Sequence, residues 1–287
     1  MEICVIPVRP RRSLLYMPAS NERAIDKARS LACDGLILDL EDAVAPDAKV
    51  EARKNAVRAL QTGGFGGREI VVRINALDTP WGEADLAAIS EAAPEAVLVP
   101  KISSADELAP YAEGLGPETR LWAMIETCQG LLNLDAIAGF GAPLDVLVVG
   151  ANDLAKDMRC RLGIERTPLH TALSLTVMAG RAHGLGVIDA VFNDIADLEG
   201  LAQQCRQGLD FGFDGKSLIH PGQIDTANLI FTPDPAEVSW ARQVIAAFES
   251  PENADKGVLK LEGRMIERLH LDEARRLIAI ADAIAAR

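Results

Sequence analysis

The chain has 287 residues, of which 49% are hydrophobic, 25% charged and only 4% aromatic, which is typical of a globular protein with an aliphatic core. Its formal net charge of −13 excludes the basic surface that nucleic-acid binding requires, so no nucleic-acid partner is expected. A small anionic ligand is not excluded, because a few local arginines and lysines can bind one inside an acidic protein.

Targeting and redox features of the sequence favour a cytoplasmic protein. The five cysteines are scattered and form no CxxC pair, which predicts free thiols in a reducing compartment. The N-terminal stretch MEICVIPVRPRR carries its charges after a short apolar run, the reverse of a signal peptide. Since no run approaches the roughly 18 apolar residues of a membrane span, no membrane partner is expected either.

Short apolar runs alternate with amphipathic stretches along most of the chain. The runs, expected to be strands, are 13–17, 35–40, 70–74, 96–100, 121–125, 145–150, 186–191 and 211–215. Segments with helical spacing lie between them, for example 21–32, 47–60, 84–92, 105–115, 169–183 and 198–207. This alternation predicts the α/β class and a (β/α)8 TIM barrel over residues 11–232. The alternative, a doubly wound open sheet, often has a GxGxxG loop, and this chain has none.

The pattern changes after the eighth unit. FTPDP at 231–235 interrupts it, and a helical segment at 236–249 and a polar linker at 250–257 follow. A long amphipathic segment at 263–286 ends the chain. Residues 233–287 are therefore expected to form a C-terminal helical extension.

Polar residues follow several of the expected strands. Since active sites of such barrels lie at the C-terminal ends of the strands, these residues are candidates for the site. They are Asp39, Glu41, Asp42, Arg73, Asn75, Lys101, Glu126, Asn152, Asp153, Asp214, Lys216 and His220. Carboxylates crowded at one mouth repel each other unless a cation lies among them, and Glu126 and Asp153 follow neighbouring strands. Two carboxylates, with other positions left to water and substrate, suit Mg²⁺ better than zinc.

Two interpretations of these residues stay open. Taken singly, each carboxylate would be interpreted as a helix N-cap, but several strand ends with polar residues together favour an active site. Arg73 either clamps a substrate carboxylate or enolate oxygen, or forms a structural ion pair with Glu41 or Asp42. Both roles can hold together, since a carboxylate partner can orient an arginine for a ligand.

A set of motifs in this order resembles a known family. The segments are RRSLLYMPASNERAIDKA, LDLEDAVAPDAKVEAR, VRIN, VPKI, MIETCQGLLN, GANDLAKD and GFDGKSLIHPGQI. They are similar to the citrate lyase β-subunit-like group of the HpcH/HpaI aldolase/citrate lyase superfamily, which includes malyl-CoA and citramalyl-CoA lyases and a malyl-CoA thioesterase. The resemblance extends from about Arg11 to the C-terminus.

The resemblance implies a set of site residues in the barrel. It implies that Mg²⁺, for which Mn²⁺ can substitute, is bound by Glu126 and Asp153. Arg73 would contact the substrate, while Glu41 and Asp42 would hold metal-bound water, order the site and bind substrate. Arg73 and Asp42 are counted among the catalytic residues.

The resemblance also implies a CoA site and a shared lid. Tyr16, Arg23 and Lys27 match positions near the CoA phosphates and pantetheine. The C-terminal segment would form a lid over a neighbouring subunit of a homotrimer or hexamer and deliver a catalytic carboxylate there. In GRMIERLH that carboxylate is Glu267, where many members have Asp. The longer side chain either costs rate, since a misplacement of about 1 Å can cost ~10²-fold, or reaches a water instead of a carbon.

The activity implied is that of a Mg²⁺-dependent lyase. It would cleave, or form by Claisen condensation, a 3-hydroxy-dicarboxylic acyl-CoA such as malyl-, β-methylmalyl- or citramalyl-CoA. The products would be an acyl-CoA and glyoxylate or pyruvate, with Arg73 stabilising negative charge and Glu267 protonating the enolate carbon. One alternative is a (3S)-malyl-CoA thioesterase in which Glu267 activates water. Others are a citrate lyase β subunit acting on a citryl-carrier protein, a regulator with a dead site, and an aldolase for free hydroxy-keto acids.

Overall fold

The computed structural model describes residues 9–253 and 255–287. They belong to two compact units, one spanning Arg11–Phe231 and the other containing Thr232–Arg287. The expected boundary between barrel and extension was after residue 232. Residues 1–8, which contain Cys4 and the N-terminal apolar run, lie outside the described residues, as does one residue of the expected linker 250–257.

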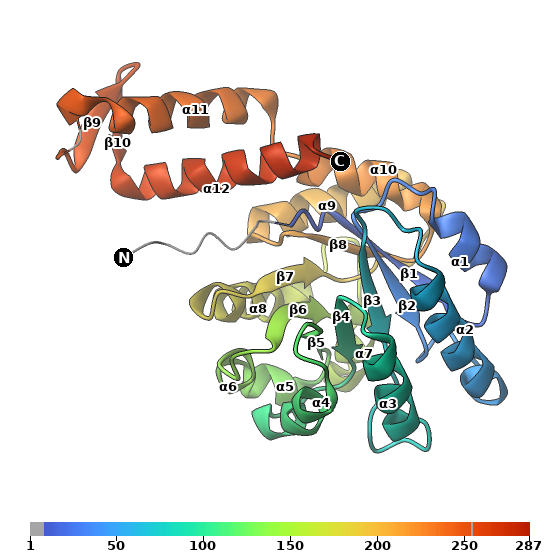
Figure 1. Ribbon diagram of the computed structural model, residues 1–287. Helices are drawn as coiled ribbons and strands as arrows, with labels where there is room; N and C mark the ends of the chain where they lie inside the picture. Colours follow the sequence, from blue (N-terminus) through green and yellow to red (C-terminus); the bar gives the residue numbers. More distant parts are fainter. Residues whose placement is uncertain (1–8, 254) are drawn as a thin grey trace. The chain divides into compact units, whose positions relative to one another are not determined.

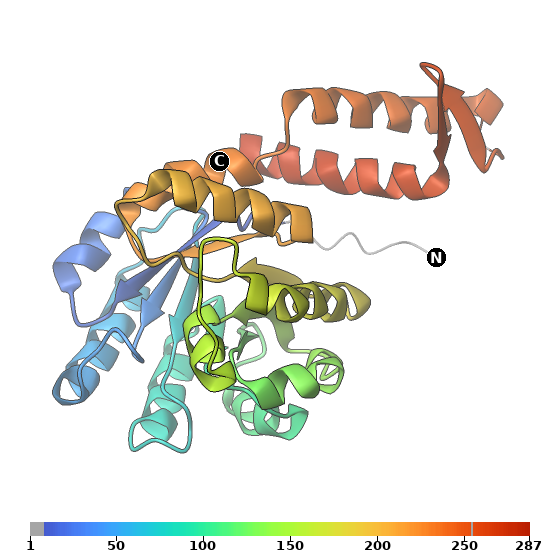
Figure 2. The same ribbon diagram turned by 180° about the vertical axis from the view of Figure 1, so that it is seen from behind.

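The first unit is a closed barrel of eight parallel strands whose spatial order follows the sequence (Figures 1 and 2). The strands are β1 (Ser13–Pro18), β2 (Gly35–Asp39), β3 (Glu69–Arg73), β4 (Ala96–Val99), β5 (Arg120–Ile125), β6 (Leu144–Val149), β7 (Gly186–Asp189) and β8 (Gly215–Leu218). Nearly every strand residue is buried, as expected for parallel strands covered on both faces. The predicted TIM barrel is confirmed.

Helices surround the barrel and follow each strand. They are α1 (Glu22–Ala28), α2 (Lys49–Thr62), α3 (Gly82–Ala92), α4 (Ala109–Gly114), α5 (Cys128–Leu132), α6 (Leu134–Ala138), α7 (Ala151–Met158), α8 (His170–Ala182), α9 (Leu198–Phe211) and α10 (Ile224–Phe231). Polar side chains cap some N-termini: Asn21 accepts a hydrogen bond from the Ala24 N–H, and Asp197 accepts one from the Gly200 N–H.

Side chains that point into the barrel form a small apolar core of their own. It includes Leu14, Ile37, Val71, Leu98, Trp122, Met124, Val146, Val148 and Ile188, while the alternate strand residues pack against the helices. Arg11 closes the N-terminal end of this core. Its Nη2 donates to Glu69 Oε1 at 2.8 Å and to Asp145 Oδ2 at 2.6 Å, and its Cζ lies 5.0 Å from the Trp122 ring. The interior is therefore packed and sealed at this end.

The second unit consists of two helices and a hairpin. Helices α11 (Pro235–Glu249) and α12 (Arg268–Ala285) lie side by side. Strands β9 (Val258–Leu261) and β10 (Arg264–Glu267) form an antiparallel hairpin that connects them at one end (Figure 1). Their apolar faces form a separate core that includes Val244, Phe248, Ile266 and Leu271.

Two sequence expectations are wrong in detail. The eighth strand was expected at 211–215, but Phe211 ends α9, Gly212 adopts a left-handed φ of 97°, and the strand begins only at Gly215. Residues 233–287 were expected to form a helical extension that ends in the amphipathic segment 263–286. Instead Glu262 and Gly263, with φ of 46° and 83°, turn the chain into β10, because positive φ at both central residues suits a two-residue hairpin turn.

Other expectations concern membranes and thiols. Among the described residues, no helix combines the length and apolarity that crossing a membrane requires. Cys33, Cys128, Cys160 and Cys205 are free thiols, in agreement with the expected absence of a disulfide frame in this part of the chain.

Candidate active site

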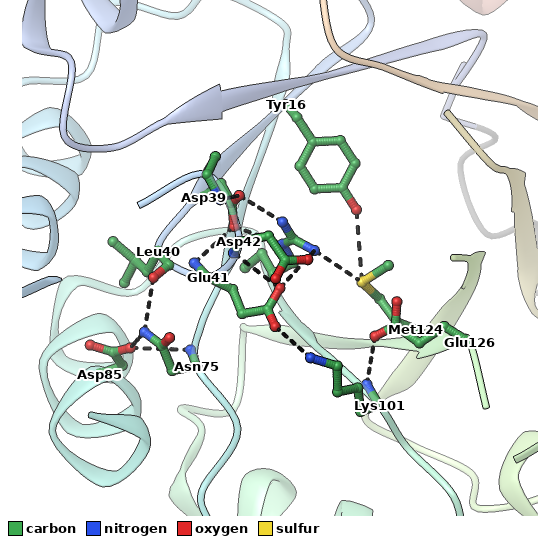
Figure 3. A network of polar contacts seen from close by, with 12 residues as sticks. Tyr16, Asp39, Leu40, Glu41, Asp42, Asn75, Asp85, Lys101, Met124 and Glu126 are labelled. Carbon is green, nitrogen blue, oxygen red and sulfur yellow. Dashed lines mark hydrogen bonds and ion pairs between the residues drawn. The ribbon is translucent and has the colours of Figure 1, made fainter. Parts of the chain in front are cut away.

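A cavity of about 280 Å³ opens at the C-terminal ends of the barrel strands. Its walls come from strand ends and the loops that follow them, and Figure 3 shows the polar network on one side. The lining residues are Tyr16, Asp39, Asp42, Ala43, Arg73, Met124, Glu126, Val149, Gly150, Asn152, Asp153, Val191, Asn193, Ser217 and Ile219. The site expected at the barrel mouth is thus matched by a cavity that contains many of the candidate residues.

Arg73 is held by Asp39. The two residues end β3 and β2 and are direct partners in the strand register. Arg73 Nε donates to Asp39 Oδ1 at 2.7 Å, and Nη2 donates to Oδ2 at 2.6 Å, which is a bidentate pair. Asp39 also accepts from the backbone N–H groups of Glu41 and Ala43. The expected ion pair of Arg73 with Glu41 or Asp42 is present, but the bidentate pair with Asp39 was not expected. The register of β2 and β3 is the signal that could have indicated it.

Glu41 and Asp42 complete the shell around Arg73. Its Nη1 lies 2.9 Å from Glu41 Oε2 and 3.5 Å from Asp42 Oδ2, and Lys101 Nζ lies 3.1 Å from Glu41 Oε1 (Figure 3). Burial raises the pKa of Glu41 despite the nearby Arg73. Burial also acts on Asp42, but its hydrogen bond with Glu41 and the charges of Arg73 and Lys101 outweigh it and lower the Asp42 pKa. Three carboxylates therefore surround one guanidinium.

A buried lysine supports this acidic loop from behind. Lys49 Nζ donates to the carbonyl oxygens of Leu40 and Glu41 and to Asn75 Oδ1, each at 2.8 Å. Asn75 in turn donates from Nδ2 to Asp85 Oδ2 at 2.6 Å. Lys49 is only 6% exposed, so its three donors are all satisfied inside the protein. Lys49 was not among the residues expected at the site, because nothing in the sequence distinguishes it from a surface lysine at the start of a helix.

Glu126 and Asp153 also line the cavity. Glu126 follows β5, and Asp153 is in the first turn of α7 after β6; Ile125 and Val149 pair where these strands end. Glu126 is 2% exposed, and its Oε1 accepts from the Lys101 N–H at 2.8 Å. Burial, together with the charge of Asp153, raises the pKa of Glu126 to about 7. A buried carboxylate beside a second one is the arrangement that a bound cation would stabilise.

Three observations test whether these residues fit a metal ion. Among the described residues, there is no cluster of three or more His, Cys, Asp or Glu that could hold a metal, so the protein would supply a sparse set of oxygen ligands. A Cβ at Gly150 would lie 2.2 Å from Glu126 Oε2, so only glycine leaves room for this carboxylate. The cavity lining carries four carboxylates and one arginine, a formal charge of −3. The donor set fits Mg²⁺, which keeps several waters.

The three residues expected near CoA lie in different places. Tyr16 lines the cavity inside the barrel, with Arg73 Cζ 4.9 Å from the centre of its ring. Arg23 and Lys27 are exposed on α1 and do not line the cavity. Glu267 belongs to the second unit, where it caps α12 and its N–H donates to His270 Nδ1 at 2.8 Å.

Lys216 was expected at the barrel mouth, but its side chain points away from it. It pairs in register with Asp189, and both face the helices, whereas the adjacent Ile188 and Ser217 point into the barrel or its cavity. Lys216 Nζ donates to Asp189 Oδ2 at 2.8 Å, and Arg166 Nη1 donates to Asp189 Oδ1 at 2.6 Å. All three side chains are at most 2% exposed. They form a buried ion cluster outside the cavity.

The other two polar residues expected at the end of the eighth strand also lie outside the cavity lining. Asp214 Oδ1 accepts from Arg181 Nη2 at 2.7 Å, just before β8 begins. His220 Nδ1 accepts from the Gly222 N–H at 3.1 Å at the start of a short 3₁₀ turn. Both have local structural roles.

A protein-family model, HpcH/HpaI aldolase/citrate lyase, matches residues 12–221. The chain belongs to the HpcH/HpaI aldolase/citrate lyase family. This family member is 48% identical over 277 residues to the (3S)-malyl-CoA thioesterase of Cereibacter sphaeroides, with 96% of each chain covered. It is 33% identical over 294 residues to the mitochondrial citramalyl-CoA lyase of Homo sapiens, covering 96% of this chain and 86% of that protein.

A solved structure agrees with this family assignment. The CitE protein of Mycobacterium tuberculosis, solved in complex with magnesium, acetoacetate and coenzyme A, matches with a TM-score of 0.77 and 30% identity. The match covers 94% of this chain and 97% of that one. The resemblance inferred from the motifs is confirmed, and this HpcH/HpaI aldolase/citrate lyase family member is an enzyme whose named relatives are lyases and a thioesterase.

Proposed function

We propose that this protein hydrolyses the CoA thioester of a short hydroxy-dicarboxylic acid such as malyl-CoA, and that it needs Mg²⁺. From the sequence alone, carbon–carbon cleavage was the first expectation and hydrolysis the second. The order is now reversed, because the thioesterase relative is 48% identical and the citramalyl-CoA lyase relative 33%. The observation that carries the proposal is a single cavity combining an arginine fixed by Asp39 with two carboxylates, the buried Glu126 and the half-buried Asp153.

Glu126 and Asp153 would hold the Mg²⁺, or Mn²⁺ in its place. When bound, the metal supplies positive charge that polarises substrate oxygens and offsets the acidic lining. The formal charge of −3 in the cavity supports this assignment, because a dicarboxylic thioester is itself anionic and would otherwise be repelled. The magnesium and coenzyme A in the structure of the CitE relative support it further.

The remaining cavity residues would bind and orient the acyl group. Arg73, fixed by its bidentate pair with Asp39, would bind the free carboxylate or the oxygen that becomes negative. Glu41 and Asp42, on the loop held by Lys49, would order water and substrate beside it. The Asp39 carboxylate restricts the guanidinium to one orientation, which favours a single pose of the ligand.

Hydrolysis needs a base and a site for CoA. The oxygen of water adds to the thioester carbonyl, the C–S bond breaks, and the proton removed from water goes to the leaving thiolate. We assign this proton transfer to Glu267 of a neighbouring copy in a homotrimer or hexamer, and contacts with the CoA phosphates to Arg23 and Lys27, which are exposed. Free thiols at the four described cysteines support a cytoplasmic location.

The assignment of Glu267 to a neighbouring copy can be tested with mixed subunits. Glu126→Gln and Glu267→Gln variants should each be inactive alone. Mixing them after partial dissociation should restore activity, because some sites then combine an intact metal pair with an intact Glu267. No recovery in verified mixed oligomers would show that Glu267 does not act between subunits.

The reaction itself is tested by product analysis. The purified protein is incubated with Mg²⁺ and malyl-, β-methylmalyl- or citramalyl-CoA, and products are identified by mass spectrometry. Free CoA with an intact hydroxy acid would support the thioesterase. Acyl-CoA with glyoxylate or pyruvate would support the lyase, which the similarity to citramalyl-CoA lyase makes the second candidate. Turnover of a citryl-carrier protein alone would support a citrate lyase β subunit.

A further inference from the structure

Lys101 has an unusual backbone conformation just after β4. It follows Pro100 and has a φ of 57°, in the left-handed region. The other non-glycine residues with positive φ in the described part of the chain lie at helix boundaries or in the hairpin turn; they are Ala93, Arg159, Arg166 and Glu262. A residue with a Cβ is strained in this region, and such strain persists only where the surrounding structure fixes it.

Hydrogen bonds between the segments that follow β4 and β5 fix this conformation. Ser103 Oγ lies 2.9 Å from Thr127 Oγ1, and Asn133 Nδ2 donates to the Ser103 carbonyl oxygen at 2.8 Å. The Lys101 N–H itself donates to Glu126 Oε1 at 2.8 Å. The backbone of Lys101 is therefore held against the carboxylate that is proposed to bind the metal.

The side chain of Lys101 reaches a different carboxylate. Its Nζ donates to Glu41 Oε1 at 3.1 Å, while Arg73 Nη1 lies 2.9 Å from Glu41 Oε2 (Figure 3). Burial lowers the pKa of Lys101, but the hydrogen bond and charge of Glu41 outweigh it and raise the pKa, so the ammonium stays protonated. Lys101 does not line the cavity, so it acts through Glu41, which two cations share.

The formal charges around Arg73 balance when Lys101 is included. The carboxylates in contact with the guanidinium carry three negative charges and are Asp39, Glu41 and Asp42. The cations of this cluster carry three positive charges and are Arg73, Lys101 and, behind the loop, Lys49. Without Lys101 the cluster would have a net charge of −1 and would repel an anionic ligand.

We propose that Lys101 is a positioning residue whose ammonium holds Glu41 and offsets its charge, so that Arg73 can attract an anionic group of the ligand. This inference deepens the proposed function and rests on it. A glycine would adopt the same φ without strain, so the ammonium is what lysine adds at this position. The attraction of an anion by the cluster should weaken when this charge is removed.

The first test compares Lys101→Met, which removes the charge, with Lys101→Arg, which keeps it. Lys101→Met should raise KM for malyl-CoA about tenfold with kcat within about threefold, and Lys101→Arg should keep both within about threefold of the wild type. Lys156→Met removes the same charge from an exposed residue of α7 outside the cavity lining and is the matched control. An equal rise in KM for Lys156→Met, or no rise for Lys101→Met, would overturn the inference.

A third variant separates the side chain from the backbone. Lys101→Gly removes the strain of the left-handed conformation, so it should unfold at a higher temperature than Lys101→Met. Its KM for malyl-CoA should nevertheless rise about as much, because both variants lack the ammonium. If KM instead followed the melting temperature, Lys101 would have a role in stability only.

Binding measurements do not depend on turnover. In calorimetry, Lys101→Met should weaken the binding of free malate to the Mg²⁺-loaded protein about tenfold. The difference from the wild type should shrink in about 0.5 M KCl, because salt screens a side chain that is 48% exposed. Mg²⁺ alone should bind Lys101→Met at least as tightly as the wild type, because a positive charge is lost while the backbone N–H still holds Glu126.

Two results would contradict this account of Lys101, namely an unchanged affinity for malate and a weaker affinity for Mg²⁺ in Lys101→Met. A failure of the proposed function would look different. If the wild type released no CoA from malyl-CoA, the hydrolysis would be refuted, but the calorimetry with malate would still test Lys101.

Discussion

Two buried ion clusters have nearly the same construction but lie on opposite faces of the barrel wall. In one, Asp39 and Arg73 are register partners at the ends of β2 and β3 and point into the cavity. In the other, Asp189 and Lys216 are register partners of β7 and β8, and they point toward the helices, where Arg166 joins them. The composition of such a pair therefore says little about its function.

The difference comes from strand parity. Along β2, Ile37 and Asp39 both face inward, whereas along β7 Ile188 faces inward and the adjacent Asp189 faces outward. A shift of one residue moves a side chain to the other face of the sheet. The inward pair can act on a ligand, while the outward cluster can only contribute to folding and to the placement of the strand ends.

The largest expected effect is a difference in activity between variants of the inward pair and variants of the outward cluster. Arg73→Met should lower kcat/KM about 10³-fold, since it removes the positive group proposed to bind negative charge in the cavity. Lys216→Met should stay within about threefold of the wild type, because Lys216 does not reach the cavity. Steady-state kinetics on malyl-CoA compares them directly, and equal losses would contradict the division of roles.

The next largest effect is a loss of stability when the outward cluster is disrupted. Asp189→Asn leaves Lys216 and Arg166 buried without a charged partner, so the free energy of unfolding should fall by about 3–5 kcal/mol. The activity per folded molecule should change only a few-fold. Urea denaturation followed by circular dichroism measures the first quantity, and kinetics measures the second. If stability held while activity was lost, Asp189 would belong to the reaction site after all.

The inward cluster has a support that the outward one lacks. Lys49→Met removes three hydrogen bonds that hold the loop carrying Glu41, and kcat should fall about 10- to 100-fold with little change in KM. Lys54→Met on the same helix, whose side chain is 62% exposed, is the matched control and should retain full activity. If Lys49→Met lowered the melting temperature but left kcat unchanged, Lys49 would have a role in stability only.

The affinity of the cavity for Mg²⁺ should depend on pH. The pKa of Glu126 is about 7, above its ordinary value of 4.5, so protons compete with a metal in this range. The apparent dissociation constant of Mg²⁺ should rise about tenfold between pH 8 and pH 6, as calorimetry would show. In the metal-free protein, the contribution of Glu126 to stability is fully present below pH 4.5 and is lost as pH rises through 7. A dissociation constant independent of pH would show that Glu126 is not a ligand.

The smallest effect is expected within the outward cluster itself. Lys216→Met removes one of two cations around Asp189, and Arg166 still compensates the carboxylate. Replacing a buried lysine by an apolar residue of similar length should change the free energy of unfolding by less than about 1 kcal/mol. Urea denaturation beside Asp189→Asn gives the comparison, and a loss as large as that of Asp189→Asn would refute this account.

The sequence predicted the barrel well because its strands are apolar nearly throughout, and this pattern separates them from the helices. The same property makes it impossible to tell from the sequence which alternate residues of a strand face into the barrel. For this reason Lys216 was expected at the mouth. The start of the eighth strand was displaced because FGFDG resembles a strand, although Phe211 ends a helix and Phe213 is buried before β8.

The sequence predicted those residues of the candidate site that are charged and follow an apolar strand. Arg73, Glu126 and Asp153 line one cavity, as expected for residues that close neighbouring strands. Lys49 could not be predicted, because its partners are mainly backbone carbonyls, which every residue has. The left-handed conformation of Lys101 depends on hydrogen bonds between two loops, and this is a property of three-dimensional structure.

The contacts of Arg11 with Glu69 and Asp145 close the N-terminal end of the barrel, so among the described residues the cavity opens at the C-terminal ends of the strands. In the proposed hydrolysis, reactant, water and both products would pass through this mouth, so a fragment still bound there would block the next molecule. Release should therefore be ordered, and the product that occupies the floor of the cavity should act as a competitive inhibitor. Because the N-terminal end of the barrel is closed, the rate of the enzyme would fall when its product accumulates.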